Sequence, residues 1–179
     1  MLYPSPARRE PQHFDVPSLL TSCHARIRHF SAMAVTLAET TDAPEHEIAE
    51  AARQLYRYFA HALPLHAEDE DESVLPRLAG RTAELDSRLE RMRAEHGRID
   101  ELLAPQLEAW QVLAERPAEL ATLAPRLSPT GRELRSFLGE HLESEEKYIF
   151  VALQKELSHS RLGAIEQEIR ERRRRAYRW

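Results

Sequence analysis

Cysteine, glycine and long apolar runs are all scarce in this sequence, and each scarcity excludes a class of protein. The one cysteine, Cys23, excludes an internal disulfide and a zinc or iron–sulfur site built on several thiolates. The 5 glycines and the few runs of β-branched residues argue against a β-sheet. No stretch approaches the roughly 18 apolar residues of a membrane-spanning helix, and residues 1–17 lack the apolar core of a signal peptide. We therefore expect a cytoplasmic protein with no membrane partner.

Neither sign of charge is in large excess. The formal net charge is −5, which argues against nucleic acid as the main partner. Hydrophobic residues make up 42% and charged residues 31% of the chain, a balance typical of a helical globular protein. A length of 179 residues suits one domain that buries about 70% of the surface its unfolded chain exposes.

Apolar residues recur at helical spacing along most of the chain. The pattern predicts four long helices, over residues 17–41, 42–79, 82–113 and 130–157. Thr82 is a favourable helix N-cap, Gly80 should end the second helix, and Pro64 should bend it. The proline- and alanine-rich residues 116–129 are predicted to form a crossing loop with at most one short turn, and residues 160–176 a short terminal helix.

Four long amphipathic helices with short connections predict an all-α fold, an antiparallel up-down four-helix bundle. The prolines near the start of the chain predict an extended segment before the first helix. We accordingly divide the chain into an extended N-terminal arm (residues 1–16), the four-helix bundle (residues 17–157) and a short C-terminal helix with a basic tail (residues 158–179).

Histidine stands on the apolar face of each predicted long helix. These histidines are His24, His66, His96 and His141. Two of them have a glutamate four residues later, which gives the pairs His66–Glu70 and His141–Glu145. Residues at this spacing share one helix face with Cβ atoms about 6 Å apart. Imidazole suits iron, copper and zinc, while carboxylate favours harder ions. The mixed set therefore predicts two metal ions in the bundle core.

An internal repeat supports this interpretation. His24-Ala-Arg-Ile27 on the first helix corresponds to His96-Gly-Arg-Ile99 on the third, and the two His–Glu pairs correspond on the second and fourth. The separation between histidine and His–Glu pair is nearly the same in both halves. Each half thus supplies one His and one His–Glu pair, and a pseudo-twofold axis would make one symmetric binuclear site.

The motifs resemble those of a known family. His66-Ala-Glu-Asp-Glu70 with its flanking residues, and His141-Leu-Glu-Ser-Glu145 with residues 146–150, are similar to the second- and fourth-helix signatures of hemerythrin-like, cation-binding HHE proteins. The resemblance covers about residues 17–157 and implies a four-helix bundle with a non-haem di-iron centre, bridged by carboxylates and an oxo or hydroxo group. By position, the implied metal ligands are His24, His66, Glu70, His96, His141 and Glu145. Zinc or manganese could occupy the same ligands.

Two positions depart from the oxygen-carrying hemerythrins. Those carriers have a further histidine where this chain has Asp100, and they space the last histidine and carboxylate one residue wider, which leaves Glu146 as an alternative to Glu145. A residue at i+5 is rotated about 140° from its partner on an ideal helix, so Glu145 is preferred. With four histidines, the set is closest to the di-iron domain of bacterial iron-centre repair proteins, whose added cysteine-containing domain has no counterpart here.

The missing fifth histidine implies an open iron position for a small ligand. The function expected is binding of dioxygen, nitric oxide or peroxide, for sensing, storage or detoxification. The alternatives are a di-iron enzyme (a peroxidase, catalase or nitric oxide reductase) and a regulatory bundle that metal only stabilises. A ferritin-like oxidase is disfavoured, because such bundles use Glu-x-x-His, with the order reversed and the spacing shorter.

Other reactive side chains have plainer interpretations. Cys23 is expected to be a small core residue, and His29 and His61 to face away from the metal ligands. The acidic residues around Glu70 are expected to form a solvated face; they are Glu68, Asp69, Asp71 and Glu72. The run Arg172–Arg175 is expected to be a solvated helix end.

Overall fold

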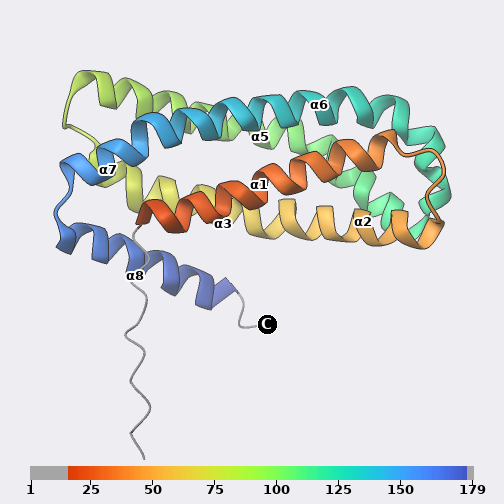
Figure 1. Cartoon of the computed structure of the whole chain (residues 1–179), viewed down its shortest axis with the longest axis horizontal. Coiled ribbons are helices and arrows are strands. Elements are labelled where there is room, and N and C mark those ends of the chain that lie inside the picture. The colour runs from red at the N-terminus through yellow and green to blue at the C-terminus, as the bar shows by residue number, and fades with distance from the viewer. Residues whose placement is uncertain (1–15, 177–179) are drawn as a thin grey trace, which may run out of the picture.

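The computed structural model describes residues 16–176, and within that range it contains helices and short connections with no strand (Figure 1). Four long helical segments form an antiparallel bundle, and a shorter helix follows, which confirms the predicted all-α bundle. The first and third segments are α1 (Val16–Glu39) and α5 (Ala83–Glu115), and the last helix is α8 (His159–Ala176). The arm predicted for residues 1–16 lies outside the described residues, except for Val16, which begins α1.

The second and fourth segments each contain π-helical turns. The second consists of α2 (Glu45–Arg57), η1 (Tyr58–Ala62), α3 (Leu63–Glu68), η2 (Asp69–Val74) and α4 (Leu75–Leu78). The fourth consists of η3 (Pro117–Glu119), α6 (Leu120–Ser144), η4 (Glu145–Ile149) and α7 (Phe150–Glu156). The η1 turn directly precedes Leu63-Pro64, where proline removes one backbone donor, so a wider turn accommodates this residue.

The predicted helix ends near residue 80 are confirmed. Gly80 has a φ of 77°, a left-handed conformation that favours glycine, and it separates α4 from α5. The Thr82 side chain accepts a 3.1 Å hydrogen bond from the Leu85 N–H and so caps α5. These local signals fix where the second segment stops and the third begins.

The prediction of a loop over residues 116–129 is wrong. The chain makes one 3₁₀ turn and then enters α6 at Leu120, so Pro125 and Pro129 lie inside a helix. Leu120 and Leu127 are buried in the apolar core, and their burial offsets the backbone donors that proline removes. Helix propensity alone was therefore a poor guide to this segment, because tertiary packing overrides it.

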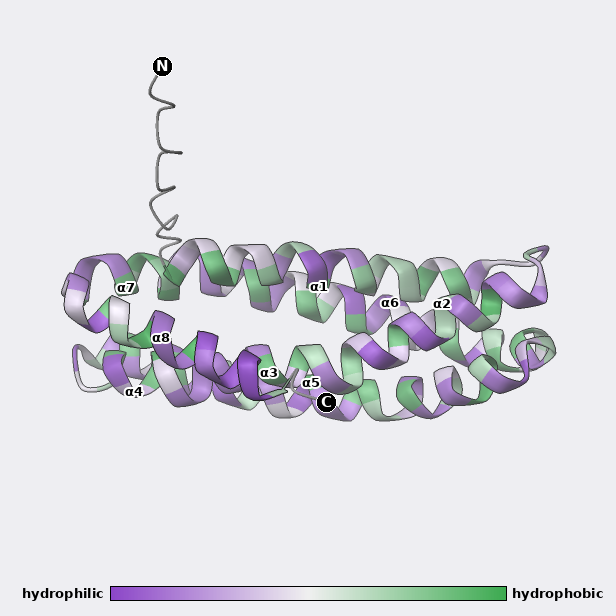
Figure 2. Cartoon of the chain, turned by 90° about the horizontal axis from the view of Figure 1, so that it is seen from below, coloured by the Kyte–Doolittle hydropathy of each residue, from purple (hydrophilic) through white to green (hydrophobic). Residues whose placement is uncertain are grey.

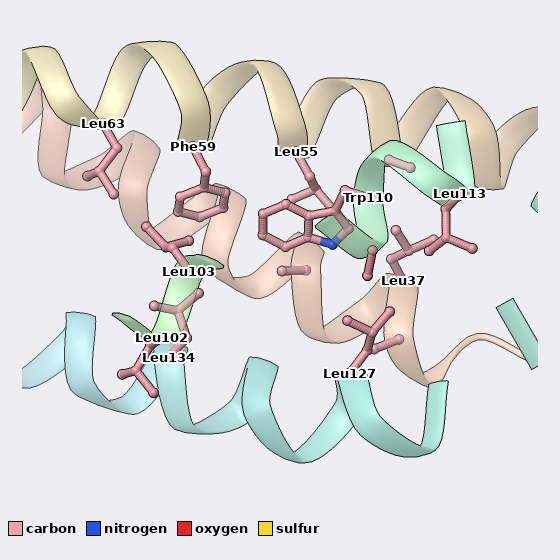
Figure 3. Packing of buried hydrophobic residues seen from close by; sticks show 14 of the residues in the cluster. Leu37, Leu55, Phe59, Leu63, Leu102, Leu103, Trp110, Leu113, Leu127 and Leu134 are labelled. Atoms are coloured by element: carbon pink, nitrogen blue, oxygen red, sulfur yellow. The ribbon is translucent and has the colours of Figure 1, made fainter. Parts of the chain in front are cut away.

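Two apolar clusters fill the bundle, one toward each end. The larger cluster includes Phe59 and Trp110, whose rings stack with centroids 5.3 Å apart (Figure 3). The smaller one includes Leu20, Leu75 and Ile165 at the opposite end. Within the bundle, α1 packs chiefly against α6, and α2 packs against α5. Hydropathy alternates along these helices (Figure 2), as expected for elements with one buried face.

The last helix is docked on the bundle. It turns back beside α1 and η2 (Figure 1), with Ile165 and Ile169 buried in the smaller cluster. Arg77 of α4 donates two hydrogen bonds to the Glu168 carboxylate, of 3.0 and 2.6 Å. No helix between residues 16 and 176 combines the length and apolar character needed to cross a bilayer.

Candidate metal centre

A layer of buried polar side chains separates the two apolar clusters. Along α1, Leu20 belongs to the smaller cluster and Ile27 to the larger one, and His24 lies between them. On the other three segments too, the predicted ligands lie between residues of the smaller cluster and residues of the larger cluster. All six side chains meet in this layer, from four segments: His24, His66, Glu70, His96, His141 and Glu145.

The histidines direct their Nε2 atoms toward the two glutamates. Nε2 of His24 lies 3.1 Å from the Glu145 carboxylate, and Nε2 of His141 lies 2.8 Å from it. Nε2 of His66 and of His96 lie 3.5 and 3.4 Å from the Glu70 carboxylate. The imidazoles also pair edge to face, His24 with His66 and His96 with His141, each pair with ring centroids 5.1 Å apart.

Each glutamate faces both pairs of histidines, with one carboxylate oxygen toward each pair. Glu70 turns Oε1 toward His24 and His66, and Oε2 toward His96. Glu145 turns Oε2 toward His24, and Oε1 toward His96 and His141. The donor atoms form two overlapping groups that share both glutamates, and within each group all of them lie within 4.8 Å of one another. Such an arrangement suits two cations bridged by two carboxylates.

The unsatisfied polar atoms of this layer also fit a metal centre. Both carboxylate oxygens of Glu70 and of Glu145 are buried without a hydrogen-bond partner, as are Nε2 of His24 and of His66. Buried polar groups are normally hydrogen-bonded, because leaving one unpaired costs about 1–3 kcal/mol. A concentration of such atoms facing one another is expected where cations complete the coordination. The donor set therefore fits metal ions.

The carboxylates and imidazoles shift one another's pKa values. Burial alone would lower the pKa of His24 and of His96, but the Glu145 and Glu70 carboxylates raise both to about 10. The pKa values of His66 and His141 are also raised, against the effect of burial. Burial would raise the pKa of Glu145, yet the neighbouring imidazoles hold it well below its usual range. The carboxylates and the imidazoles therefore favour one another's charged forms.

Three carboxylates hold the outer nitrogens of the histidines. Nδ1 of His24 lies 2.8 Å from Glu146, and Nδ1 of His141 lies 2.9 Å from Glu95. Nδ1 of His96 lies 3.3 Å from Asp71. An outer carboxylate fixes the tautomer and the orientation of a metal-binding imidazole. The sequence alone did not assign these three acids to the imidazoles, although a signal was present, since each of them directly adjoins a proposed ligand in the chain.

Glu145 and Glu146, the two alternatives for the last carboxylate ligand, occupy different positions in the structure. The Glu145 carboxylate lies between the imidazoles and is 1% exposed, whereas Glu146 lies on the outer side of His24, where Arg28 also donates to it. His29 and His61 are exposed and lie outside the cluster, as predicted. Their ring contacts are with Phe30 and Tyr56 instead.

Three of the plainer interpretations are wrong at individual residues. Asp69 is fully buried, and Arg172 and Arg173 of α8 both donate to its carboxylate, so neither Asp69 nor this pair of arginines is a solvated surface group. Asp71 is half-buried against His96. Cys23 is half-buried rather than part of the core, and it accepts a 3.1 Å hydrogen bond from Arg173. The docking of α8, which could not be inferred from local sequence, pairs Asp69 with two arginines and places Arg173 against Cys23.

A small cavity adjoins the polar layer on the side of the larger cluster. Its volume is about 30 Å³, which is enough to hold a water molecule. The walls are mostly apolar side chains, including Phe59 and Leu138. Three proposed ligands and Asp100 also line it; the ligands are His66, His96 and His141. Asp100 thus stands beside this cavity, at the position of the absent fifth histidine.

Comparison with known proteins agrees with this geometry. No curated protein matches the chain. The family model of the hemerythrin HHE cation binding domain matches residues 15–153, which include all six clustered side chains and most of the bundle. The chain therefore belongs to the hemerythrin HHE cation-binding domain family, and its clustered histidines and glutamates could hold metal ions.

Proposed function

We propose that this chain holds a non-haem di-iron centre and binds dioxygen, nitric oxide or peroxide at an open iron position, for sensing, storage or detoxification. His24 and His66 would hold one iron, and His96 and His141 the other. Glu70 and Glu145 would bridge the two irons. The observation that carries this assignment is the opposed pair of carboxylates, each with one oxygen toward each pair of histidines.

The cavity supports binding of a small ligand. Iron bound in this layer would supply an electrophilic, redox-active centre for such a ligand. A cavity of about 30 Å³ lined by three of the histidines leaves space for a small ligand beside the proposed ligands. Its apolar walls limit access of water, and the outer carboxylates hold the imidazoles in place.

Metal content and a visible spectrum test the proposal. The protein is purified without a histidine tag, loaded anaerobically with ferrous iron, and analysed by plasma mass spectrometry. We expect about two irons per chain, as in other di-iron bundles, with charge-transfer bands that azide shifts. A chain that stays empty after loading would contradict the di-iron centre. If azide does not change the spectrum of the loaded chain, the result would support the metal site and contradict the open position.

Turnover of peroxide or nitric oxide is the second candidate function. Asp100 favours it, because an exposed carboxylate at the edge of the cavity can deliver protons from solvent toward a bound ligand. Steady-state assays with hydrogen peroxide and with nitric oxide separate the two functions. Sustained consumption that Asp100→Asn slows would support the enzyme, whereas a single stoichiometric adduct would support binding alone.

A further inference from the structure

The outer sides of the four imidazoles are not equivalent. Three Nδ1 atoms face a carboxylate, whereas Nδ1 of His66 has no aligned hydrogen-bond partner within residues 16–176. His66 is only 5% exposed, so solvent does not form a hydrogen bond with this nitrogen. The thiol of Cys23 lines the same pocket as His66 and lies within hydrogen-bonding reach of its ring. A buried nitrogen without a hydrogen-bond partner would lower the stability of the fold, and the thiol is the group that can pair with it.

The internal repeat places Cys23 in the position of an outer ligand partner. His24 corresponds to His96, so the residue before each one also corresponds, namely Cys23 in the first half and Glu95 in the second. Glu95 holds Nδ1 of His141, which is the repeat equivalent of His66. The pairs Cys23–His66 and Glu95–His141 therefore occupy matching places, with a thiol in one and a carboxylate in the other.

The sulfur is held from its other side. Nη2 of Arg173 in α8 donates a 3.1 Å hydrogen bond to Sγ of Cys23 and a 2.8 Å hydrogen bond to the buried Asp69. Cys23, His66 and Arg173 together line a pocket of about 270 Å³. The thiol is therefore fixed in place by α8 and lies within reach of small reagents.

We propose that Cys23 is the positioning residue of His66, and that it makes the two metal positions unequal. Its sulfur accepts from the Nδ1–H of His66 when Nε2 holds a metal ion. Sulfur is a weak acceptor, whereas an outer carboxylate increases the basicity of an imidazole ligand. The ion held by His24 and His66 is consequently the more weakly bound of the two. The proposal rests on the metal centre proposed above, but not on iron or on any small ligand.

Zinc-loaded protein allows a direct test, because zinc is diamagnetic and suits imidazole and carboxylate ligands. Nuclear magnetic resonance of the ¹⁵N-labelled histidine rings reports each Nδ1–H separately. We expect three Nδ1–H signals typical of carboxylate hydrogen bonds and one, from His66, that differs. Cys23→Ser and Cys23→Ala should move the His66 signals and leave those of His141 in place. A merely structural role would disturb the ligands on all four segments together.

Exchanging the two outer partners provides the matched comparison. Cys23→Glu should give His66 a carboxylate-type signal, and Glu95→Cys should give His141 the thiol-type signal. In a chelator competition, we expect the two zinc ions of the wild type to differ in affinity by about tenfold, the lower end of outer-partner effects. Cys23→Glu should remove this difference. Alkylation of Cys23 with iodoacetamide, the only thiol in the chain, should perturb His66 alone.

The outcomes that overturn the inference are separate from those that overturn the metal centre. A wild-type chain that takes up neither iron nor zinc removes the metal centre, and the role of Cys23 with it. Two bound zinc ions with His66 signals that ignore Ser, Ala, Glu and alkylation at position 23 overturn only the role of Cys23. Equal affinities in the wild type, unchanged by Cys23→Glu, overturn the inequality of the two positions.

Discussion

The carboxylate of Asp69 is fully buried next to Glu70 in the chain, and Arg173 of the last helix donates a 2.8 Å hydrogen bond to it. Arg172 donates to the same carboxylate and to Glu72. Burial still raises the pKa of Asp69, so the two arginines offset the desolvation of this group only in part. The last helix therefore compensates a buried charge beside the proposed metal centre.

Removing both arginines should destabilise the whole bundle. The double substitution Arg172→Ala, Arg173→Ala leaves Asp69 buried without a partner, which should lower the free energy of unfolding by about 3 kcal/mol. Urea denaturation measures the change. Arg170→Ala, which breaks the pair between the exposed Arg170 and Glu166, is the control and should cost less than about 1 kcal/mol. Adding Asp69→Asn to the double variant should restore part of the loss, and no recovery would show that the buried charge is not the cause.

Substitution of the proposed ligands should distinguish the glutamates, which face both metal positions, from the histidines, which face one. Glu70→Ala removes a carboxylate that faces both pairs of histidines, so both ions should be lost. His66→Ala should remove chiefly the ion on its own side. Plasma mass spectrometry gives the metal content, and circular dichroism checks that the helices persist.

The control for the ligand series is His29→Ala, which changes an exposed histidine outside the cluster and should keep full metal content. Unchanged metal in both ligand variants would contradict the assignment. Loss of metal in His29→Ala would show that α1 presents a different face to the bundle.

Much of the fold and the grouping of the six side chains could be predicted from sequence, because both depend on local periodicity. Apolar residues at helical spacing determine which face is buried, and a glutamate four residues after a histidine shares that face. The internal repeat then relates the two halves. His24 and His96 have no glutamate at that spacing, so their assignment depends on the apolar face of each helix and on this repeat.

The features that were missed depend on contacts between distant parts of the chain. Asp69 reads as one member of an acidic run, and only the docking of α8 buries it against Arg172 and Arg173. The start of α6 at Leu120 was missed because two prolines weaken the local helix signal, while Leu120 and Leu127 gain burial in the core. Local propensity contains neither effect.

The affinity for metal should increase with pH. At neutral pH His24 and His96 are protonated in the metal-free chain, because their pKa values are about 10. Each must lose its proton to bind an ion, so the apparent dissociation constant should fall steadily from pH 6.5 toward pH 10 and then level off. Metal titrations at several pH values measure this, and an affinity independent of pH would contradict the protonated state.

The same pKa values predict how stability depends on pH. A histidine whose pKa is raised on folding stabilises the fold fully below its unfolded value of 6.5, and that contribution is lost as pH increases through about 10. The melting temperature of the metal-free chain should therefore fall over this window. The metal-loaded chain should not show this fall, because its imidazoles are already deprotonated. Parallel melting curves for the two forms would contradict the prediction.

Filling the cavity should block the small ligand without removing the metal. Leu138 is 1% exposed and lines the cavity of about 30 Å³, so Leu138→Phe places a larger ring where the ligand would bind. We expect azide affinity to fall by at least about tenfold, with metal content unchanged, as for steric exclusion from an apolar pocket. Overpacking should also lower stability by about 1–3 kcal/mol. Leu138→Met, which nearly conserves volume, is the control and should keep the azide-induced spectral shift. If Leu138→Phe retains both its metal and its full azide response, the ligand reaches the metal from another side, and Asp100 is then not at the mouth of the open position.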